Sequence, residues 1–209
     1  MTQKTFPSPP TKTTPEKPIL EHGMAMFMRE GLRGFTVEAL ARELLMSKKT
    51  IYKYFPTKEL LFKGMFSFVS GNISRWMEKL VNSPGHPLDK FKELVHTITK
   101  TSAQVNPSRL SDIKARYPDL WRDIETFRLE RRGDLLALMQ AAQTEGYIRE
   151  SLDLELTATL FMQILNSVFQ PEFFINNQIS PPQAARTFLD VFFRGLMTQK
   201  GLNHIKDQL

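Results

Sequence analysis

The chain has 209 residues, a net charge of +6 at pH 7 and no cysteine. Its hydrophobic content of 41 % can fill the core of one large domain or two small ones. The lack of cysteine excludes disulfides, thiolate metal sites and cysteine nucleophiles. The N-terminus lacks the basic and apolar regions of a signal peptide, and no run of about 20 apolar residues that could cross a bilayer is present. We therefore expect a cytoplasmic protein.

The positive charge is concentrated in one short segment. Ser47 to Lys63 contains five lysines and a single glutamate, whereas residues 66–209 together have a net charge of +1. A surface that binds nucleic acid needs basic residues clustered on one element. The segment 47–63 is therefore the first candidate for such a surface.

Residues 1–17 have the composition of a flexible tail. Prolines at positions 7, 9, 10 and 15 stand among threonine, serine and lysine. Such a segment buries too little apolar surface to offset the entropy of ordering. It is either an unstructured leader or an arm that contacts DNA electrostatically.

From residue 18 onward apolar residues recur three and four positions apart, and alternating strand patterns are absent. We therefore expect an all-α fold. Thr36, Ser47 and Thr57 are predicted to cap the second, third and fourth helices, and Ser180 with Gln183 forms a capping box at the last helix. The expected helices cover residues 18–31, 37–44, 48–55, 58–83, 87–105, 107–115, 118–144, 153–169 and 181–199.

The second and third of these helices are short and are joined by a three-residue turn. The major groove of DNA admits one helix, which needs apolar anchors on its inner side and polar groups on its outer side. Ile51 and Phe55 are four residues apart and can face the core. The other side of the same helix presents Lys48, Lys49, Tyr52 and Lys53.

These patterns divide the chain into three parts. A flexible tail at 1–17 is followed by a three-helix helix-turn-helix DNA-binding domain at 18–64. Residues 65–209 form a larger helical domain for ligand binding, regulation and dimerisation.

A set of motifs lies between Ile19 and Met65: Gly34-Phe35-Thr36-Val37, Ala41, Ser47, Thr50-Ile51-Tyr52, Tyr54-Phe55 and Lys58-Glu59-Leu60-Leu61. In its spacing, capping residues and aromatics this stretch, about a quarter of the chain, resembles the TetR family of regulators. Family members usually carry glycine in the turn where this chain has Leu45. The turn therefore either follows a different backbone path or holds Leu45 in the strained left-handed conformation.

The resemblance implies roles in DNA binding for individual residues. Thr36, Tyr54 and Lys58 look like phosphate-binding positions that set the register on the duplex. The positions that look groove-facing, and would read base edges, are Lys48, Lys49, Thr50, Tyr52 and Lys53. The alternative is that these lysines only solvate an exposed helix.

The last predicted helix carries apolar residues on two faces, so it must be covered on both sides. With the preceding helix it forms either half of a two-fold four-helix dimer interface or a buried layer inside one monomer. The candidate interface residues are Leu154, Ala158, Phe161, Leu165, Ala184, Ala185, Phe188, Leu189, Phe192 and Leu196.

Sixteen phenylalanines and ten methionines indicate an adaptable interior that could enclose an apolar ligand, although such residues more often form ordinary core. The candidate pocket residues are Phe68, Phe91, Val95, Trp121, Phe127, Met162 and Leu165.

No constellation of catalytic residues is apparent. The chain has no glycine-rich phosphate loop and no histidine placed beside a nucleophile and an orienting carboxylate, so we expect no enzyme. His22, His86, His96 and His204 lack metal-ligand spacing, which favours solvated or capping roles. We expect neither a metal nor a cofactor.

The sequence thus predicts a homodimeric, sequence-specific transcriptional regulator that binds a double-stranded DNA operator. In the leading hypothesis it is a repressor that a small apolar or amphipathic ligand releases from the operator. The alternative is a DNA-binding regulator whose C-terminal domain responds to a protein partner or to no ligand.

Overall fold

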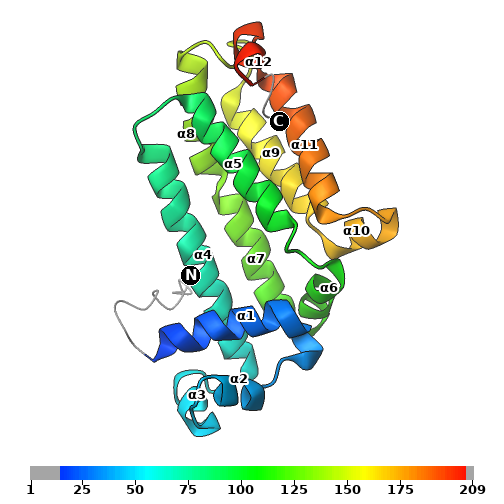
Figure 1. The fold of residues 1–209 in the computed structure, drawn as a ribbon. Helices are drawn as coiled ribbons and strands as arrows, with labels where there is room; N and C mark the ends of the chain where they lie inside the picture. Colours follow the sequence, from blue (N-terminus) through cyan, green and yellow to red (C-terminus); the bar gives the residue numbers. More distant parts are fainter. Residues whose placement is uncertain (1–14, 206–209) are drawn as a thin grey trace, which may run out of the picture. The chain divides into compact units, whose positions relative to one another are not determined.

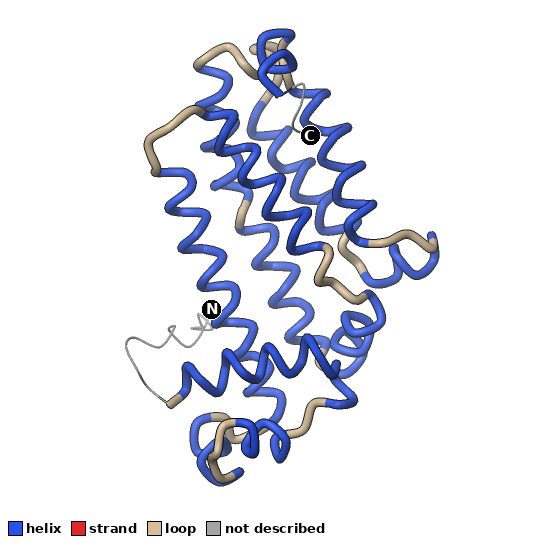
Figure 2. The backbone as a smooth tube through the Cα atoms, in the orientation of Figure 1, coloured by secondary structure: helices blue, strands red, loops and turns tan. Residues whose placement is uncertain are grey.

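The computed structural model describes residues 15–205, and its fold is all-α, as the sequence predicts. Between these residues the backbone consists of helices and loops without a strand (Figure 2), and one isolated antiparallel bridge joins Ile148 to Met197. The predicted tail falls mostly on residues 1–14, which lie outside the described residues. Glu16 and Lys17, also assigned to the tail, belong to the first helix.

Twelve helices follow one another in the described part of the chain (Figure 1). They are α1 (Glu16–Gly34), α2 (Val37–Glu43), α3 (Lys48–Tyr54), α4 (Lys58–Asn82), α5 (Pro87–Ser102), α6 (Pro107–Arg116), α7 (Pro118–Glu130), α8 (Arg132–Thr144), α9 (Leu154–Val168), α10 (Pro171–Asn177), α11 (Pro181–Leu196) and α12 (Gln199–Ile205). None of these helices combines the length and the apolar composition that a membrane span needs.

Two predicted helix limits are wrong. The single helix expected at 118–144 is two helices, because the backbone at Arg131 leaves the helical region with ψ near 0° and its N–H donates to the Arg128 carbonyl at 3.1 Å. The stop expected at Gly31 is a kink instead. Gly31 has a φ of 70°, and α1 continues beyond it to Gly34.

Two short helices were not predicted. α10 and α12 each have seven residues, and neither carries a sequence motif such as the one that identified the equally short α2 and α3. The last long helix ends at Leu196 rather than at Gln199, because Met197 adopts an extended conformation and forms the bridge to Ile148. The chain then turns into α12.

The chain forms two compact units. Among the described residues, the first contains 15–75 together with Asp112–Ile124, and the second contains Trp76–Ser111 and 125–205. The units describe packing, and the domain limits at 18–64 and 65–209 stay predictions.

The first unit packs α1, α2, α3 and the start of α4 around a small core. Its most deeply buried side chains include Ile19, Met26, Leu40, Ile51 and Met65. α1 and α4 approach closely, since a Cβ added at Gly23 would lie 2.6 Å from the sulfur of Met65. The segment Asp112–Ile124 joins this unit through an ion pair of 3.5 Å between Arg33 and Asp112 and through the rings of Phe62 and Tyr117, whose centres are 5.4 Å apart.

In the second unit α5, α8, α9 and α11 lie side by side (Figure 1). Aromatic pairs fill the space between them: Phe91 packs on Phe193 at 5.3 Å between ring centres, and Phe161 packs on Phe192 at 4.7 Å. Backbone hydrogen bonds fix the loop before α9 to the end of α11, because the N–H of Thr198 donates to the Tyr147 carbonyl at 2.9 Å.

Candidate DNA-binding interface

Side-chain caps hold the helix-turn-helix in place. At the start of α2 the N–H of Ala39 donates to Thr36 Oγ1 at 3.1 Å, and at the start of α3 the N–H of Thr50 donates to Ser47 Oγ at 3.0 Å. Thr57 accepts from the Leu60 N–H at 3.1 Å in the first turn of α4. A cap of this kind contributes about 1 kcal/mol. The three caps predicted for this region are confirmed, as is the Ser180 cap of α11.

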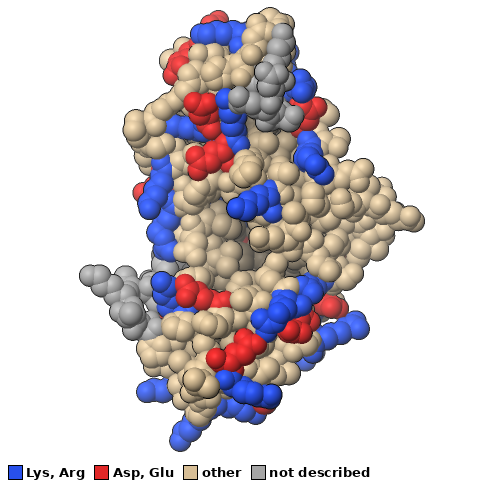
Figure 3. Space-filling model, in the orientation of Figure 1, with Lys and Arg blue, Asp and Glu red and all other residues tan. Residues whose placement is uncertain are grey.

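α3 turns one side to the core and the other to solvent. Ile51 is fully buried, whereas Lys49, Tyr52 and Lys53 are exposed. In the space-filling view basic side chains gather over the part of the surface where Figure 1 places α3 (Figure 3). The helix therefore combines an apolar anchor with an outward face of cations and a phenol.

Lys48 is paired with a carboxylate on α2. Its Nζ donates to Glu38 Oε1. This contact raises the pKa of the Lys48 ammonium and lowers the pKa of the Glu38 carboxyl, so both groups are charged at neutral pH. Both side chains are exposed, and an exposed ion pair is weak enough for a phosphate to replace the carboxylate.

Thr50 and Tyr54 are only half-buried, and Thr36 is exposed. The Thr50 hydroxyl lies 2.8 Å from Ser47 Oγ, so this hydrogen bond orients it along the helix start. The structure thus places these three predicted DNA-binding residues on the helix-turn-helix, and their contacts with DNA stay predictions.

The ammonium group of Lys58 faces the protein. Its Nζ donates to the Phe35 carbonyl at 2.6 Å, and it lies 5.3 Å from the centre of the Phe35 ring and 5.8 Å from that of Phe62. Burial lowers the pKa of this amine. The contact ties the start of α4 to the loop before α2, and it leaves the predicted phosphate contact of Lys58 without support from the side-chain position.

Leu45 occupies the left-handed conformation that the sequence left open. Its φ is 52°, and its side chain is 94 % exposed in the turn between α2 and α3. A residue with a Cβ is strained in this conformation by about 1–2 kcal/mol. The Met46 N–H still donates to the Ala41 carbonyl at 2.8 Å, which closes the end of α2.

Arg42 is a basic residue of this region that sequence analysis did not assign. It is exposed in the last turn of α2, next to the turn that leads to α3. Arg42 could have been identified from its position, since it lies on the first helix of the pair, and that helix crosses the phosphate backbone.

Two short capped helices, a tight turn and an outward cationic face together define a helix-turn-helix DNA-binding domain. Residues 19–65 match the family model described as "Bacterial regulatory proteins, tetR family". The uncharacterized HTH-type transcriptional regulator YvaF of Bacillus subtilis (strain 168) is 24 % identical over 182 residues, which cover 87 % of this chain and 95 % of YvaF.

Solved structures share the fold over most of the chain. A transcriptional regulator from Cytophaga hutchinsonii ATCC 33406 has a TM-score of 0.68 at 18 % identity, covering 87 % of this chain and 98 % of that one. A TetR transcription regulator from Haloarcula marismortui ATCC 43049 has a TM-score of 0.68 at 13 % identity, with coverage of 88 % and 98 %. The match at residues 19–65 and the shared fold together make this chain similar to DNA-binding transcriptional regulators of the TetR family.

The predicted dimer-interface residues are mostly covered within one protomer. Leu165, Phe188 and Phe192 are half-buried. The other seven are buried: Leu154, Ala158, Phe161, Ala184, Ala185, Leu189 and Leu196. These seven residues therefore fit the alternative interpretation, in which the side chains are buried inside one monomer. The apolar side chains that α9 and α11 expose are Leu156, Leu160, Ile164 and Val191.

The predicted pocket residues are divided between the two units. Phe68 and Trp121 belong to the first unit, and Phe91, Val95, Phe127, Met162 and Leu165 belong to the second. Phe91, Trp121 and Met162 are buried as ordinary core. Val95 lines a cavity of about 530 Å³ whose other walls come from α5 and α11.

Two histidines that are far apart in the sequence meet in the structure. The rings of His86 and His204 are stacked, with centres 4.4 Å apart and planes at 3°. His86 also caps α5, as predicted, because its Nδ1 accepts the Leu88 N–H at 3.2 Å. Nothing in the spacing of the two residues indicated their contact.

The strain at Leu45 gives a test of the turn. Leu45→Gly is expected to raise the free energy of unfolding by about 1 kcal/mol, because glycine adopts a positive φ without a steric penalty. In a chain of this size the midpoint of thermal unfolding should then rise by about 2–4 °C. Leu45→Ala, the matched control, keeps the strain and removes only an exposed side chain, so its midpoint should stay near that of the parent. A decrease for Leu45→Gly would contradict the left-handed turn.

Proposed function

We propose that the protein is a homodimeric, sequence-specific repressor whose two α3 helices enter successive major grooves of an operator. The observation that carries this proposal is the division of α3 into a buried anchor at Ile51 and an exposed face at Lys49, Tyr52 and Lys53. A helix with this division can be inserted in the groove without unfolding its own domain. A protein with this task works where the DNA is, in the cytoplasm.

Three kinds of contact follow from where the side chains lie. Lys49, Tyr52 and Lys53 are exposed on α3, where they can reach base edges. Thr36, Arg42 and Tyr54 stand at the ends of α2 and α3, where phosphate contacts would fix the register. Lys48 would exchange Glu38 for a phosphate or a base. Thr50 would supply its methyl group to a thymine. Lys58 supports this surface from inside and is not one of the proposed contacts.

The roles on α3 can be tested in the intact protein. Lys49→Ala and Tyr52→Ala should each weaken binding to a selected operator by about tenfold while nonspecific binding changes little, because a base contact is worth about 1–3 kcal/mol. The operator is obtained by selecting bound fragments from random DNA, and affinities are measured by fluorescence anisotropy at fixed salt.

Lys79→Ala is the matched control, because Lys79 is an exposed lysine near the end of α4, outside the helix-turn-helix. It should bind like the parent. Equal losses on operator and random DNA for Lys49→Ala and Tyr52→Ala would show that α3 does not read sequence, and undiminished binding would remove α3 from the interface.

A stripe of exposed apolar side chains supports dimerisation through α9 and α11. Leu156, Leu160 and Ile164 follow one another at four-residue intervals on α9 with exposed fractions of 55, 50 and 42 %, and Val191 on α11 is 68 % exposed. The two helices are in contact, since the rings of Phe161 and Phe188 lie 4.9 Å apart. Exposed apolar side chains grouped in this way mark an interaction surface. We propose that a second copy covers it around a two-fold axis.

This proposal revises the predicted interface. The contacts are made by the outward stripe of α9 and by Val191, with the half-buried Phe188 and Phe192 at its edge. The residues that face the protomer core keep their structural role. Two copies that read successive major grooves on one face of the duplex need their α3 helices about 34 Å apart, one turn of the double helix.

Leu160→Glu places a charge in the middle of the stripe and should convert the dimer to a monomer. Its mass is measured by sedimentation equilibrium at micromolar concentration, and its operator affinity should fall at least tenfold because both half-sites can no longer be held together. Leu60→Glu is the control, an equally exposed leucine on α4 in the first unit. It should stay dimeric. A dimeric Leu160→Glu protein would place the interface elsewhere.

The cavity of the second unit is the proposed effector site. It has a volume of about 530 Å³, within the range of small-molecule sites. Its lining residues are Lys92, Val95, His96, Thr99, Arg186, Thr187, Leu189, Asp190 and Arg194. Aliphatic groups thus stand beside three cationic side chains, of which Lys92 is paired with Asp89 at 3.0 Å and Arg194 with Asp190 at 2.5 Å. We infer an amphipathic ligand with an anionic head group that Arg186 would bind.

A hydrogen bond connects the cavity-bearing helix to α4. Trp76 Nε1 donates to Glu93 Oε1 of α5 at 3.1 Å, and α5 carries four of the lining residues. α4 is one continuous helix, and its residues up to Arg75 belong to the first unit, which contains the helix-turn-helix. A ligand that shifts α5 would thereby tilt α4. Full release requires a preference of about 5.5 kcal/mol for the DNA-incompetent state.

The ligand class can be tested by thermal shift with medium-chain carboxylates. These should raise the unfolding midpoint of the parent protein and release it from the operator, whereas the alcohols of equal chain length should do neither. Arg186→Ala should lose the shift, and Lys100→Ala, an exposed lysine of α5 outside the cavity lining, should keep it. The absence of any shift in the parent would reject the effector proposal and favour the regulator that answers to a protein partner or to no ligand.

A further inference from the structure

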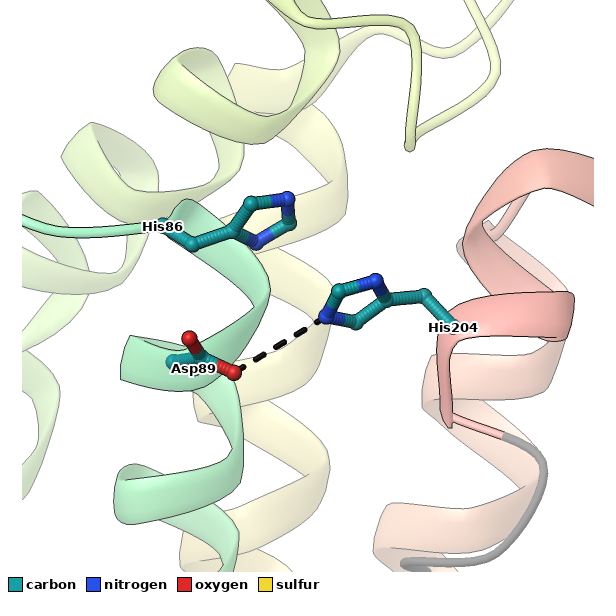
Figure 4. Close-up of side chains that lie close together, drawn as sticks. All are labelled: His86, Asp89 and His204. Carbon is teal, nitrogen blue, oxygen red and sulfur yellow. Dashed lines mark ion pairs between the residues drawn. The ribbon is translucent and has the colours of Figure 1, made fainter.

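Three side chains capable of binding a metal ion meet in the second unit (Figure 4). His86 precedes α5, Asp89 lies in its first turn, and His204 comes from α12. One ligand atom from each lies within 4.8 Å of the other two, and the pair between His204 Nε2 and Asp89 Oδ1 is 3.8 Å apart. In the close-up the two rings face each other and the carboxylate lies beside them.

The hydrogen bonds of His86 fix which of its nitrogens can bind a metal. Its Nδ1 accepts the backbone N–H of Leu88 at 3.2 Å, so this nitrogen carries a lone pair and no proton. In the neutral ring the proton is then on Nε2, which donates to the Tyr147 hydroxyl at 2.8 Å. A histidine ligand usually donates its other N–H to a neighbouring group in just this way, which orients the ring and makes the lone pair more basic.

The carboxylate of Asp89 is ready to bind a cation. Lys92 Nζ lies 3.0 Å from Oδ1, and this hydrogen bond, followed by the nearby His86 and His204, lowers the pKa of the Asp89 carboxyl. The group is therefore ionised at neutral pH. A metal ion would replace Lys92 as its partner. Lys92 reaches Asp89 from the next turn of the same helix, and its release leaves the backbone unchanged.

The donor set and its exposure suit a small divalent cation. Two imidazole nitrogens and one carboxylate oxygen are typical ligands of zinc, with bonds of about 2.0–2.2 Å. In the stacked arrangement, with ring planes at 3°, the in-plane lone pairs of the two imidazoles do not converge on one point, so the His204 ring must turn to aim Nε2 at the ion. Asp89 and His204 are exposed and can make this adjustment by side-chain rotation. Solvent would complete the coordination sphere.

We propose that His86 through Nδ1, His204 through Nε2 and Asp89 through its carboxylate form a site for a divalent transition-metal ion, with Zn²⁺ as the preferred occupant. The ion links α12 to the first turn of α5, two elements that already touch. When the metal binds, the 3.2 Å hydrogen bond from the Leu88 N–H to His86 Nδ1 is broken, because the metal takes the same lone pair. Lys200, a further cation of this region, lies 4.3 Å from the centre of the Tyr147 ring and donates to the Glu145 carbonyl at 2.8 Å.

The site is tested by titrating the full-length protein, freed of any affinity tag, with Zn²⁺ in a calorimeter and with Co²⁺ in a spectrophotometer. We expect one equivalent of either metal per chain with micromolar or tighter affinity, an unfolding midpoint that rises with Zn²⁺, and visible Co²⁺ absorption bands from nitrogen and oxygen ligands. His204→Gln and Asp89→Asn should each weaken binding at least tenfold. His22→Gln, which removes an exposed histidine of α1 in the first unit, outside the cluster, should bind like the parent.

A second variant separates the ligand shell from the fold. Tyr147→Phe keeps the ring that packs beside His86 and removes the hydroxyl that accepts from Nε2, so affinity should fall about tenfold while the midpoint in EDTA changes little. Circular dichroism in EDTA checks that all variants are folded. The proposal is overturned if the parent shows no saturable binding of either metal, or if His204→Gln and His22→Gln bind equally well.

Discussion

The burial of Ile51 is the constraint on which the rest of the DNA-binding surface depends. α3 has two turns, and one fully buried side chain in its middle decides which residues face outward. Lys49, Tyr52 and Lys53 are exposed because Ile51 is not. The caps at Thr36 and Ser47 hold α2 and α3 in the register that seats this anchor. A helix this short would not form alone in water, so packing rather than propensity maintains it.

Lys58 extends the same constraint to α4. Its ammonium group bonds to the Phe35 carbonyl and lies against two aromatic rings, so the start of the long helix is fixed to the loop that begins α2. In the second unit Trp76 connects the far half of α4 to α5. Each unit therefore fixes its own part of α4 by a polar contact.

Local signals made the DNA-binding unit predictable, and contacts between distant segments limited the rest. Caps, a turn and apolar residues spaced three and four apart identify α2 and α3. Leu45 in place of the usual glycine indicated a left-handed conformation as one of two possibilities, and the structure contains it. The apolar residues of α9 occupy two faces of the helix. The periodicity does not show which of these faces is buried inside the protomer. Leu156, Leu160 and Ile164 were therefore missed. The meeting of His86 and His204 depends on the path of 117 intervening residues, which no local pattern encodes.

The pairing of Lys48 with Glu38 has a consequence for ion exchange. Each phosphate neutralised by a lysine displaces about one condensed cation from the duplex. Lys48 can make such a contact only by giving up its pair with Glu38. The attraction lost within the protein is then subtracted from the attraction gained on DNA. Lys48 would therefore add less to DNA affinity than an exposed lysine without an acidic partner, although the cation released from the duplex is the same.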